Sequence, residues 1–513
     1  MVDVNNRYRV GGTVHGAVLC GVEAVRVEVE VDLLRRLPCV VIVGLPSPSV
    51  RESAERVRSA IQGAGLEFPR SRVVISMAPA DLRKEGTGFD LPVAIGILAA
   101  HGIIRAEAAS RWLLAGELAL SGLLRPVRGA LAMACLAREH QMAGIIVPEE
   151  NGAEAALVPG LQVRVARTLL DVVQHLNGEV ELPTPADEER LPEAPPLDLR
   201  DVRDQPIARF ALEVAAAGGH NLLMEGPPGC GKTMLAARLP GILPPLSQEE
   251  ALECTRIHSV AGLRTEGQGI IASRPFRAPH HSVSTAGLLG GADLRPGEAS
   301  LAHHGVLFLD EFPEFRRDIR EGLRGPLEDR RIVLTRASGT VTFPAGFSLV
   351  AAANRCLCGY FGHPRQACRC SPPERQRYRN RLSGPILDRI DCRLLLSPVG
   401  AEVQFDGGEG EGSAAVRARV VAARARQYAR NGPGVNNAAL PADQLAGRVL
   451  ASPAALSALV DHVDRTGTSA RAAKRVLRVA RTIADIEGAV AVEPEHLGAA
   501  LQLRVDALAE EAP

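Results

Sequence analysis

The sequence predicts an α/β fold class in three parts: an N-terminal α/β domain, a central α/β domain with a parallel sheet, and a C-terminal helical domain. Three observations support this prediction. Strand-like and helix-like apolar patterns alternate over residues 1–180. A glycine-rich loop follows an apolar strand and precedes a helix near residue 226, and the sequence after residue 413 is rich in Ala and Arg with helical periodicity. The 513 residues are enough for roughly three domains.

Composition and charge limit the functions that the chain can have. Aromatic residues make up only 3%, so the cores must be built from Val, Leu, Ile and Ala. No apolar run approaches the ~18 residues of a membrane span, and residues 1–7 lack the pattern of a signal peptide. We therefore expect a cytoplasmic protein without a membrane partner. The 59 basic and 59 acidic residues cancel, so any nucleic-acid binding requires a locally basic surface.

The first 180 residues predict a half-buried strand in which Val25, Val27, Val29 and Val31 alternate with other residues. The apolar run Cys39–Val43 predicts a second strand that is more buried. Further elements follow as a helix over 49–62, a strand over 73–76, a helix over 91–100, a strand over 145–147 and a helix over 168–176.

Two segments with linker composition divide the rest of the chain. Residues 181–200 contain five prolines among acidic residues, which is typical of a semi-rigid, exposed linker. The central domain is expected over 201–400, and the glycine-rich run Gly407–Gly412 marks its end. Residues 413–513 form the helical part, in which 470–488 is the clearest helix.

The glycine-rich loop matches the P-loop pattern in the strand–loop–helix context that the motif requires. Its backbone N–H groups and the helix N-terminus are suited to phosphate oxygens. Lys232 is expected to reach the β- and γ-phosphates of ATP, and Thr233 to ligate Mg²⁺. The predicted nucleotide-binding residues of the loop are Gly226, Pro227, Pro228, Gly229, Cys230, Gly231, Lys232 and Thr233.

A second apolar strand, Val306–Leu309, ends in two acids and follows the P-loop by about eighty residues, which is typical of a Walker B motif. We expect Asp310 to hold Mg²⁺ and Glu311 to polarise the water that attacks the γ-phosphate.

Three further residues have a catalytic and a structural interpretation. Asn354 ends a buried strand and either contacts the γ-phosphate or starts a turn. Arg389 stands near a helix end, where an arginine of a neighbouring subunit can neutralise the transferring phosphate. Arg471 opens a helix and is placed to contact the phosphate of its own chain. From the residues alone, both arginines are equally compatible with structural roles.

Four cysteines lie within fifteen residues: Cys356, Cys358, Cys368 and Cys370. Four thiolates suit a tetrahedral structural Zn²⁺ site, although zinc pairs are usually spaced by two to four residues instead of one. Reduced thiols without a metal and a redox pair are the alternatives.

The segment 331–343 predicts a hairpin with its turn at Ala337–Gly339 and Arg336 near the tip. In the channel of a ring such a tip would touch a phosphate backbone. A solvated hairpin is the alternative.

Taken together, these residues make the whole chain resemble the ComM/YifB family of magnesium-chelatase-related AAA+ ATPases. The resemblance is strongest over residues 221–233, in the Arg-Pro-Phe-Arg-Ala-Pro-His-His-Ser segment at 274–282, over 296–311 and over 356–391. It implies a AAA+ core with an insert near 260–300, a C-terminal helical lid, and ATP and Mg²⁺ as cofactors.

The resemblance also implies roles and partners. Asn354 becomes sensor 1, Arg389 the arginine finger and Arg471 the sensor 2 arginine. The family forms homo-oligomeric, hexameric rings. ComM proteins are ATP-driven DNA helicases that promote branch migration during uptake of transforming DNA. We therefore expect a hexameric motor that acts on single-stranded or branched DNA.

Residues 1–180 resemble the proteolytic domain of Lon-type proteases, but Gly88 stands where the nucleophilic serine belongs, with Thr87 adjacent. A nucleophile displaced by one residue is misplaced relative to its base, which argues against protease activity. Asp204 precedes Gln205 where many relatives have Gly, which affects the loop on the adenine side. The alternatives to a DNA motor are a magnesium-chelatase-type ATPase that remodels a protein partner and a Lon-like protease.

Overall fold

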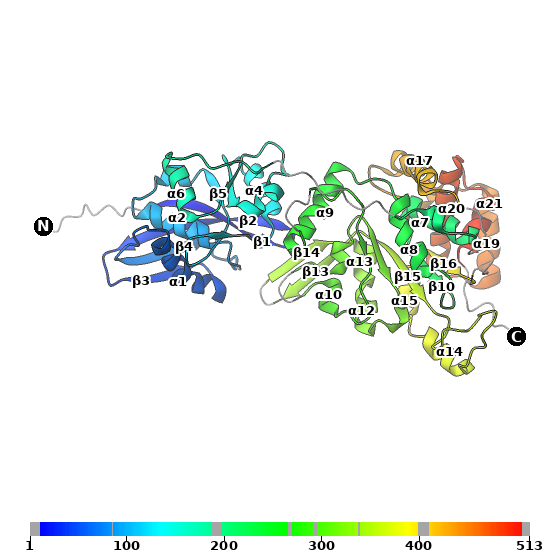
Figure 1. Ribbon diagram of the computed structural model, residues 1–513. Coiled ribbons are helices and arrows are strands. Elements are labelled where there is room, and N and C mark those ends of the chain that lie inside the picture. Colours follow the sequence, from blue (N-terminus) through cyan, green and yellow to red (C-terminus); the bar gives the residue numbers. More distant parts are fainter. Residues whose placement is uncertain are drawn as a thin grey trace.

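The computed structural model describes residues 11–84, 86–186, 197–264, 269–291, 295–336, 339–398 and 410–504. Figure 1 shows the α/β domain of the N-terminal residues at one end, the P-loop domain in the middle and the C-terminal helices at the other end. No helix within these ranges is both long and apolar enough to cross a membrane.

A seven-stranded sheet forms the centre of the N-terminal domain, in the order β3-β4-β2-β1-β5-β8-β9. In β2, the side chains of Val27, Val29 and Val31 are buried, as the alternating pattern predicts. The strands are β1 (Gly11–Cys20), β2 (Glu23–Leu34), β3 (Cys39–Val43), β4 (Arg72–Ala78), β5 (Trp112–Leu114), β8 (Gly144–Pro148) and β9 (Val163–Ala166), with a small hairpin of β6 (Glu117–Leu118) and β7 (Leu124–Arg125) beside them.

The strand Cys39–Val43 forms where the sequence predicts it, but the prediction that it is more buried is wrong. It is the edge strand of the sheet and pairs only with β4, so its two end residues are exposed. The predicted helices are confirmed as α1 (Pro48–Gly63), α2 (Asp90–Ala100) and α6 (Leu169–Asn177), and the domain also contains α3 (Ala106–Ala109), α4 (Ala130–Glu139) and α5 (Glu149–Ala155).

Both described ends of the proline-rich linker pack onto the neighbouring domains. Leu182 is 4% exposed, and the backbone N–H of Val165 in β9 donates to the carbonyl of Pro183. At the other end, Leu199 is 1% exposed and belongs to the core of the P-loop domain. The exposed linker expected over 181–200 is therefore shorter at both ends, and its centre, 187–196, lies outside the described residues.

The central domain contains a five-stranded sheet whose paired strands are all parallel, in the order β11-β12-β15-β10-β16. Glu225 at the end of β10 pairs with Ala353 of β15, and Leu309 of β12 pairs with Ala351 of β15. The carboxyl ends of these strands therefore share one edge of the sheet, where parallel α/β sheets bind ligands. The strands are β10 (Leu222–Glu225), β11 (Phe276–Arg277), β12 (Val306–Leu309), β15 (Ser348–Ala353) and β16 (Cys392–Leu395).

Helices and a hairpin cover this sheet. The predicted hairpin is confirmed as antiparallel β13 (Arg331–Arg336) and β14 (Gly339–Pro344), while residues 337 and 338 of its tip lie outside the described residues. Toward its tip, Val341 packs in one apolar cluster with Val22, which follows β1 of the N-terminal domain. The helices are α7 (Pro206–Gly218), α8 (Lys232–Ile242), α9 (Gln248–Ala261), α10 (Thr285–Leu289), α11 (Glu298–Leu301), α12 (Arg317–Gly322), α13 (Arg324–Asp329), α14 (Pro372–Arg379) and α15 (Gly384–Leu387).

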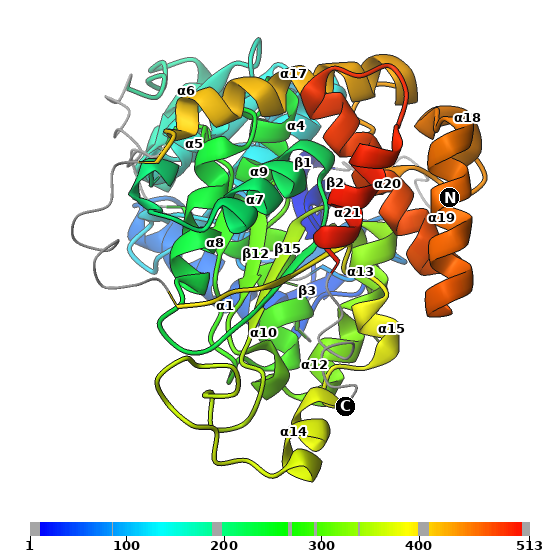
Figure 2. The same cartoon turned by 90° about the vertical axis from the view of Figure 1, so that its right-hand side faces the viewer.

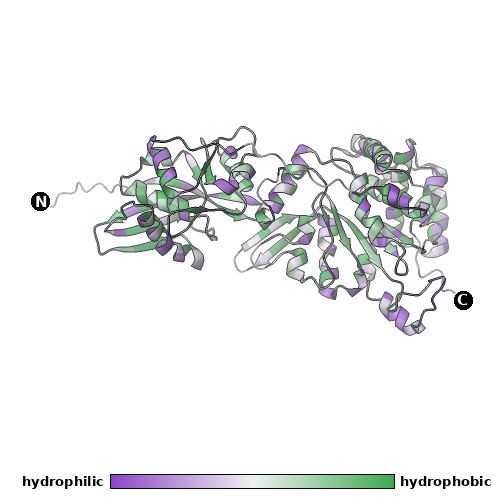
Figure 3. Cartoon of the chain, in the orientation of Figure 1, coloured by the Kyte–Doolittle hydropathy of each residue, from purple (hydrophilic) through white to green (hydrophobic). Residues whose placement is uncertain are grey.

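The C-terminal helices share a core with the face of the sheet that α7 and α8 cover, since buried side chains of α17 and α20 belong to the same apolar cluster. Figure 2 shows this bundle, and Figure 3 shows that hydrophilic residues gather on outward faces. The helix predicted over 470–488 is confirmed as α20, which Ser469 caps at its N-terminus and Gly488, with a φ of 77°, ends. The helices are α17 (Ser413–Asn431), α18 (Leu445–Val449), α19 (Pro453–Thr466), α20 (Ala470–Glu487) and α21 (Pro494–Gln502).

A buried ion network holds α20 against α17. Asp485 is fully buried and lies 2.7 Å from the guanidinium of Arg430 and 3.0 Å from that of Arg481, which is 1% exposed. The amide of Asn437 also donates to the Asp485 carboxylate at 2.8 Å. The buried Arg481 and the half-buried Arg430 therefore depend on one carboxylate.

We expect Asp485→Ala to destabilise the C-terminal bundle by about 3–5 kcal/mol, because it leaves the buried guanidinium of Arg481 and the half-buried one of Arg430 without their counter-charge. Urea unfolding followed by circular dichroism measures this loss. Asp461→Ala on the exposed side of α19 is the matched control. Equal midpoints for the two variants would contradict a structural role of the network.

Candidate nucleotide-binding site

The P-loop forms because its glycines adopt backbone conformations that other residues disfavour. Gly229 and Gly231 have φ values of 78° and 86°, in the left-handed region, and Gly231 immediately precedes α8. A Cβ atom on Gly226 would lie 2.6 Å from the carbonyl oxygen of Leu396, so that position has no room for a side chain. The loop therefore turns tightly from β10 into the N-terminus of α8, where anions are stabilised.

The Lys232 ammonium lies across the mouth of this loop. Its Nζ donates to the carbonyls of Gly226 at 2.7 Å and Pro227 at 3.0 Å. It also donates to Oδ1 of Asn354, 3.3 Å away at the end of β15. The lysine of the P-loop and the asparagine predicted to sense the γ-phosphate thus meet at one point.

Oxygen ligands suited to Mg²⁺ lie beside the loop. The Thr233 hydroxyl donates to Oδ2 of Asp310 at 2.9 Å, which joins the start of α8 to the end of β12. Oδ1 of Asp310 accepts the backbone N–H of Glu311, also at 2.9 Å. A hydroxyl and a carboxylate in contact are the donor set that Mg²⁺ uses beside nucleotide phosphates, so these residues fit the ion.

Glu311 contacts a histidine to which the sequence analysis gave no role. Its Oε2 lies 3.2 Å from Nδ1 of His281, and its backbone φ of 52° is in the left-handed region. The His281 ring packs against His280 and, edge-on, against Phe315. The signal in the sequence was the pair of adjacent histidines at 280–281. The contact itself joins segments thirty residues apart and depends on the tertiary fold.

A cavity of about 410 Å³ adjoins the P-loop, and Asp310 is not among its lining residues. Gln205 lines it and donates from its side-chain amide to the carbonyl of Cys230 at 2.8 Å. Asp204 and Gln205 have φ values of 56° and 63°, so Asp204 adopts a conformation that favours glycine. The lining residues are Asp201, Val202, Arg203, Gln205, Gly229, Cys230, Gly231, Met234 and Leu235.

The two predicted catalytic arginines lie together in a different cavity. Arg389 and Arg471 both line a pocket of about 310 Å³, with Lys474, Arg475 and Arg478. Among the residues that the structure describes, those lining this pocket include none of the P-loop. Arg471, which was expected to contact the phosphate of its own chain, thus lines a pocket without P-loop residues, and its role stays a prediction.

Arg389 is held inside its own protomer. One guanidinium nitrogen donates to the carbonyl of Pro385 at 2.6 Å, and another lies 2.6 Å from the carboxylate of Glu328. Two residues further along the chain, the carboxylate of Asp391 accepts a hydrogen bond of 2.6 Å from the guanidinium of Arg475 in α20. Burial acts to raise the pKa of Asp391, but His220 and Arg475 hold it below its usual range.

The four cysteines after Asn354 converge. Their four Sγ atoms all lie within 4.8 Å of one another, and the Sγ of Cys356 lies 3.4 Å from that of Cys358. Burial raises the pKa of Cys356 to about 12. In Cys358, burial is outweighed by backbone N–H groups of Tyr360 and Arg369, and the pKa falls to about 6.

Two residues near Gly88 in the segment that resembles the Lon nucleophile region have contacts within the N-terminal domain. The ammonium of the buried Lys84 donates to the carbonyl of Pro79, and the hydroxyl of Thr87 donates to the carboxylate of Glu117. Within the described part of the domain, Lys84 and Thr87 share no hydrogen bond. The hydroxyl of Thr87 is therefore paired with the carboxylate of Glu117 and not with the ammonium of Lys84.

Comparison with known proteins places the fold and the site in one family. The model of magnesium chelatase, subunit ChlI, matches residues 198–403, its C-terminal model matches 410–504, and a further ChlI model matches 29–151. The chain is 44% identical to the YifB protein of Salmonella typhimurium over 496 residues, 96% of each chain.

Two other relatives differ in their coverage. The competence protein ComM of Haemophilus influenzae is 42% identical over 501 residues, 96% of this chain and 97% of its own. The Holliday junction branch migration complex subunit RuvB of Mycobacterium ulcerans is 27% identical over 172 residues, 31% of this chain and 40% of its own. The chain belongs to the ComM/YifB family of magnesium-chelatase-related AAA+ proteins.

Proposed function

We propose that the protein is an ATP hydrolase that assembles into a ring, in which ATP hydrolysis drives the remodelling of DNA. One observation carries the proposal. Lys232, Thr233, Asp310 and Asn354 converge at one edge of the sheet, while Arg389 and Arg471 line a separate pocket. Each complete site would then form between two copies of the chain. One copy supplies the phosphate-binding half and the other supplies the arginine half.

Within the phosphate-binding half, each side chain has a distinct task. The P-loop N–H groups and Lys232 bind the β- and γ-phosphates, and the cavity beside Gln205 accepts the base. Thr233 and Asp310 hold Mg²⁺, which neutralises charge on the phosphates when bound. Glu311 accepts a proton from the attacking water, and Asn354 orients that water.

The arginine half has the charge that a triphosphate requires. Five cationic side chains line the pocket, against the two carboxylates of Glu328 and Asp388. We infer that Arg389 and Arg471 both act on the nucleotide of a neighbouring subunit, with Arg389 released from Glu328 when the ring closes. Arginines that neutralise a transferring phosphate contribute about 10³–10⁵ in rate.

DNA is the proposed substrate because two relatives are named for DNA processes, competence and Holliday junction branch migration. We propose a hexameric ring that acts on single-stranded or branched DNA and promotes branch migration during recombination of transforming DNA in the cytoplasm. A magnesium-chelatase-type motor that remodels a protein partner is the second candidate, which the family models favour. The Lon-like character of residues 1–180 stays a prediction.

The proposal is tested by measuring ATP hydrolysis with and without a synthetic four-strand junction, alongside a strand-exchange readout. We expect DNA to raise the rate and the junction to be processed. Lys232→Ala should abolish turnover, whereas Glu311→Gln should bind ATP and hydrolyse it at least about a hundredfold more slowly, since general base catalysis is worth about 10²–10⁴.

A hydrolysis rate that is the same on every DNA, with no DNA retained at low salt, would refute the DNA motor and favour the protein-remodelling candidate. Normal turnover by Glu311→Gln would refute Glu311 as the base.

His281 is expected to position Glu311. His281→Ala should lower kcat about tenfold to a hundredfold with little change in KM, because it frees the carboxylate without touching the phosphate loop. His280→Ala is the matched control, since His280 hydrogen-bonds to Ser282 instead. An equal loss of kcat in both variants would indicate a general defect of the segment.

Mixing experiments test the composite site. Arg389→Ala subunits and Lys232→Ala subunits are each expected to be inactive, but mixed rings contain interfaces that pair two intact halves. Hydrolysis should therefore reappear as the two are titrated together, with a maximum near equal amounts. A rate that stays at background at every ratio would contradict an arginine acting between subunits.

A further inference from the structure

A strongly basic segment follows Asn354 of the proposed ATP site directly in the sequence. We call residues 355–381 the basic arm. It follows Asn354 at the end of β15, carries α14 and projects from the body of the molecule (Figures 1 and 2). The arm contains seven arginines and a single acid, Glu374, in a chain whose formal net charge is zero. It is thus a locally basic surface of the kind that nucleic-acid binding would require here.

The sulfur positions at the root of the arm fit a tetrahedral metal. The Sγ atoms of Cys358 and Cys368, and those of Cys368 and Cys356, are both 3.6 Å apart. Four thiolates about 2.3 Å from a zinc ion lie about 3.8 Å from one another, whereas a disulfide places two sulfurs about 2 Å apart.

Backbone groups support the charge of the thiolates. The N–H of Phe361 points to the Sγ of Cys356 at 3.3 Å, and the N–H of Cys358 points to that of Cys370 at 3.4 Å. Donors of this kind orient metal ligands and stabilise their charge.

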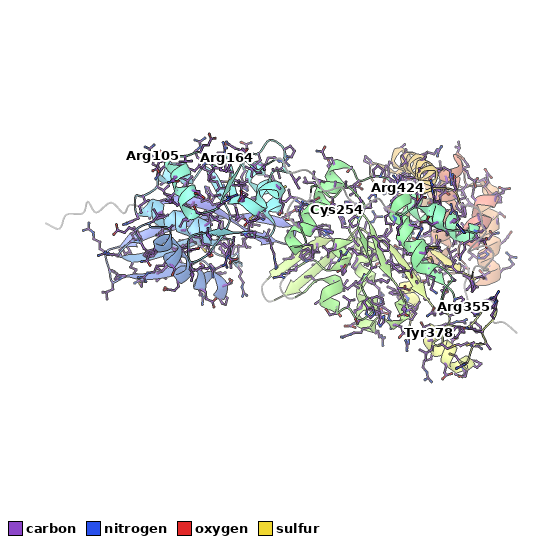
Figure 4. The ribbon with its side chains drawn as sticks, viewed as in Figure 1. Arg105, Arg164, Cys254, Arg355, Tyr378 and Arg424 are labelled. Carbon is purple, nitrogen blue, oxygen red and sulfur yellow. The ribbon has the colours of Figure 1, made fainter. Side chains whose placement is uncertain are left out.

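The arm has a small interior of its own. The ring of Phe361 lies under the guanidinium groups of Arg375 at 4.3 Å and Arg355 at 4.7 Å, while Arg381 covers Tyr378 at 5.2 Å. Figure 4 labels Arg355 and Tyr378 at the base of α14. These cation–π contacts join the cysteine loop to the helix. With so few apolar residues available, a metal is the means by which a segment this small becomes ordered.

Three arginines of the arm are left for an external partner. Arg365, Arg369 and Arg377 are exposed, and none forms an ion pair with any residue that the structure describes. A planar, charged guanidinium in water is suited to phosphate oxygens.

The arm also touches both sides of the ATP site. A Cβ atom on Gly359 would lie 3.1 Å from Cγ of Pro228 in the P-loop. On the other side, Arg381 lies 2.6 Å from the carboxylate of Glu314, three residues after Glu311. A ligand on the arm is therefore one contact away from the groups that bind and hydrolyse ATP.

We propose that Cys356, Cys358, Cys368 and Cys370 bind one structural Zn²⁺, and that the basic arm it orders holds DNA phosphates through Arg365, Arg369 and Arg377 and couples DNA binding to ATP hydrolysis. The DNA part of this inference rests on the proposed function as a DNA motor. The zinc part does not.

Metal analysis tests the zinc site first. Protein purified without chelator should contain about one zinc per chain, and the double variant Cys358→Ser/Cys370→Ser should contain less than a tenth of that. Cys135→Ser, in the N-terminal domain, is the control and should retain the metal. A wild-type protein without zinc, or one with a disulfide in this segment under non-reducing mass analysis, would overturn the site.

Charge reversal tests the DNA contact. The triple variant Arg365→Glu/Arg369→Glu/Arg377→Glu should bind a fluorescent junction about tenfold or more weakly than wild type, with a shallower dependence of affinity on salt, since phosphate contacts set that slope. Its hydrolysis without DNA should stay unchanged, while its stimulation by DNA should be lost. The matched control reverses Arg51, Arg70 and Arg105, which are exposed on the N-terminal domain, and should behave as wild type.

The outcomes separate this inference from the proposed function. If wild type neither binds DNA nor is stimulated by it, the proposed function fails and so does the DNA partner of the arm. If wild type responds to DNA and the triple variant responds equally, only the arm is refuted. A triple variant that no longer forms rings, measured by mass photometry, would assign the arm to subunit contacts and overturn its role in DNA binding.

Discussion

The contact between the Lys232 ammonium and the Asn354 amide, 3.3 Å apart, is the interaction on which the organisation of the site depends. It exists because β10 and β15 are paired in parallel and end at the same edge of the sheet. The same edge carries Asp310 from β12, which the Thr233 hydroxyl reaches. Three segments spread over more than a hundred residues thus place phosphate-binding, metal-binding and sensing groups within one small volume.

We propose that this volume is one half of a catalytic centre. The arginines suited to neutralise a transferring phosphate lie in their own pocket, next to the helical bundle, and Arg389 is paired with Glu328 there. The buried Asp391, which contacts Arg475 of α20, ties this pocket to the bundle. Under the proposed function, a single protomer would hydrolyse ATP inefficiently, and assembly would supply the missing charge. The basic arm, with Gly359 against the P-loop, offers a second route by which a ligand reaches the same centre.

Local patterns were sufficient to predict the P-loop, the acids after β12 and the asparagine after β15, because each stands at a strand end that is visible in the sequence. They also located the hairpin and three of the six helices described in the N-terminal domain, α1, α2 and α6. They failed where the answer depends on which segments become neighbours. The edge position of β3 follows from sheet order, the contact between His281 and Glu311 from the path of the insert, and the place of Arg471 beside Arg389 from how the bundle docks. The spacing of the cysteines, likewise, could not show that their sulfurs converge.

The central claim is that one nucleotide is held by two copies of the chain. A structure of the Glu311→Gln variant assembled with ATP and Mg²⁺, determined by electron cryomicroscopy, tests it most directly. The account predicts a closed ring in which the γ-phosphate lies between Lys232 of one subunit and the guanidinium groups of Arg389 and Arg471 of the next. A nucleotide contacted by Arg471 of its own chain, or bound fully within a single protomer, would contradict it.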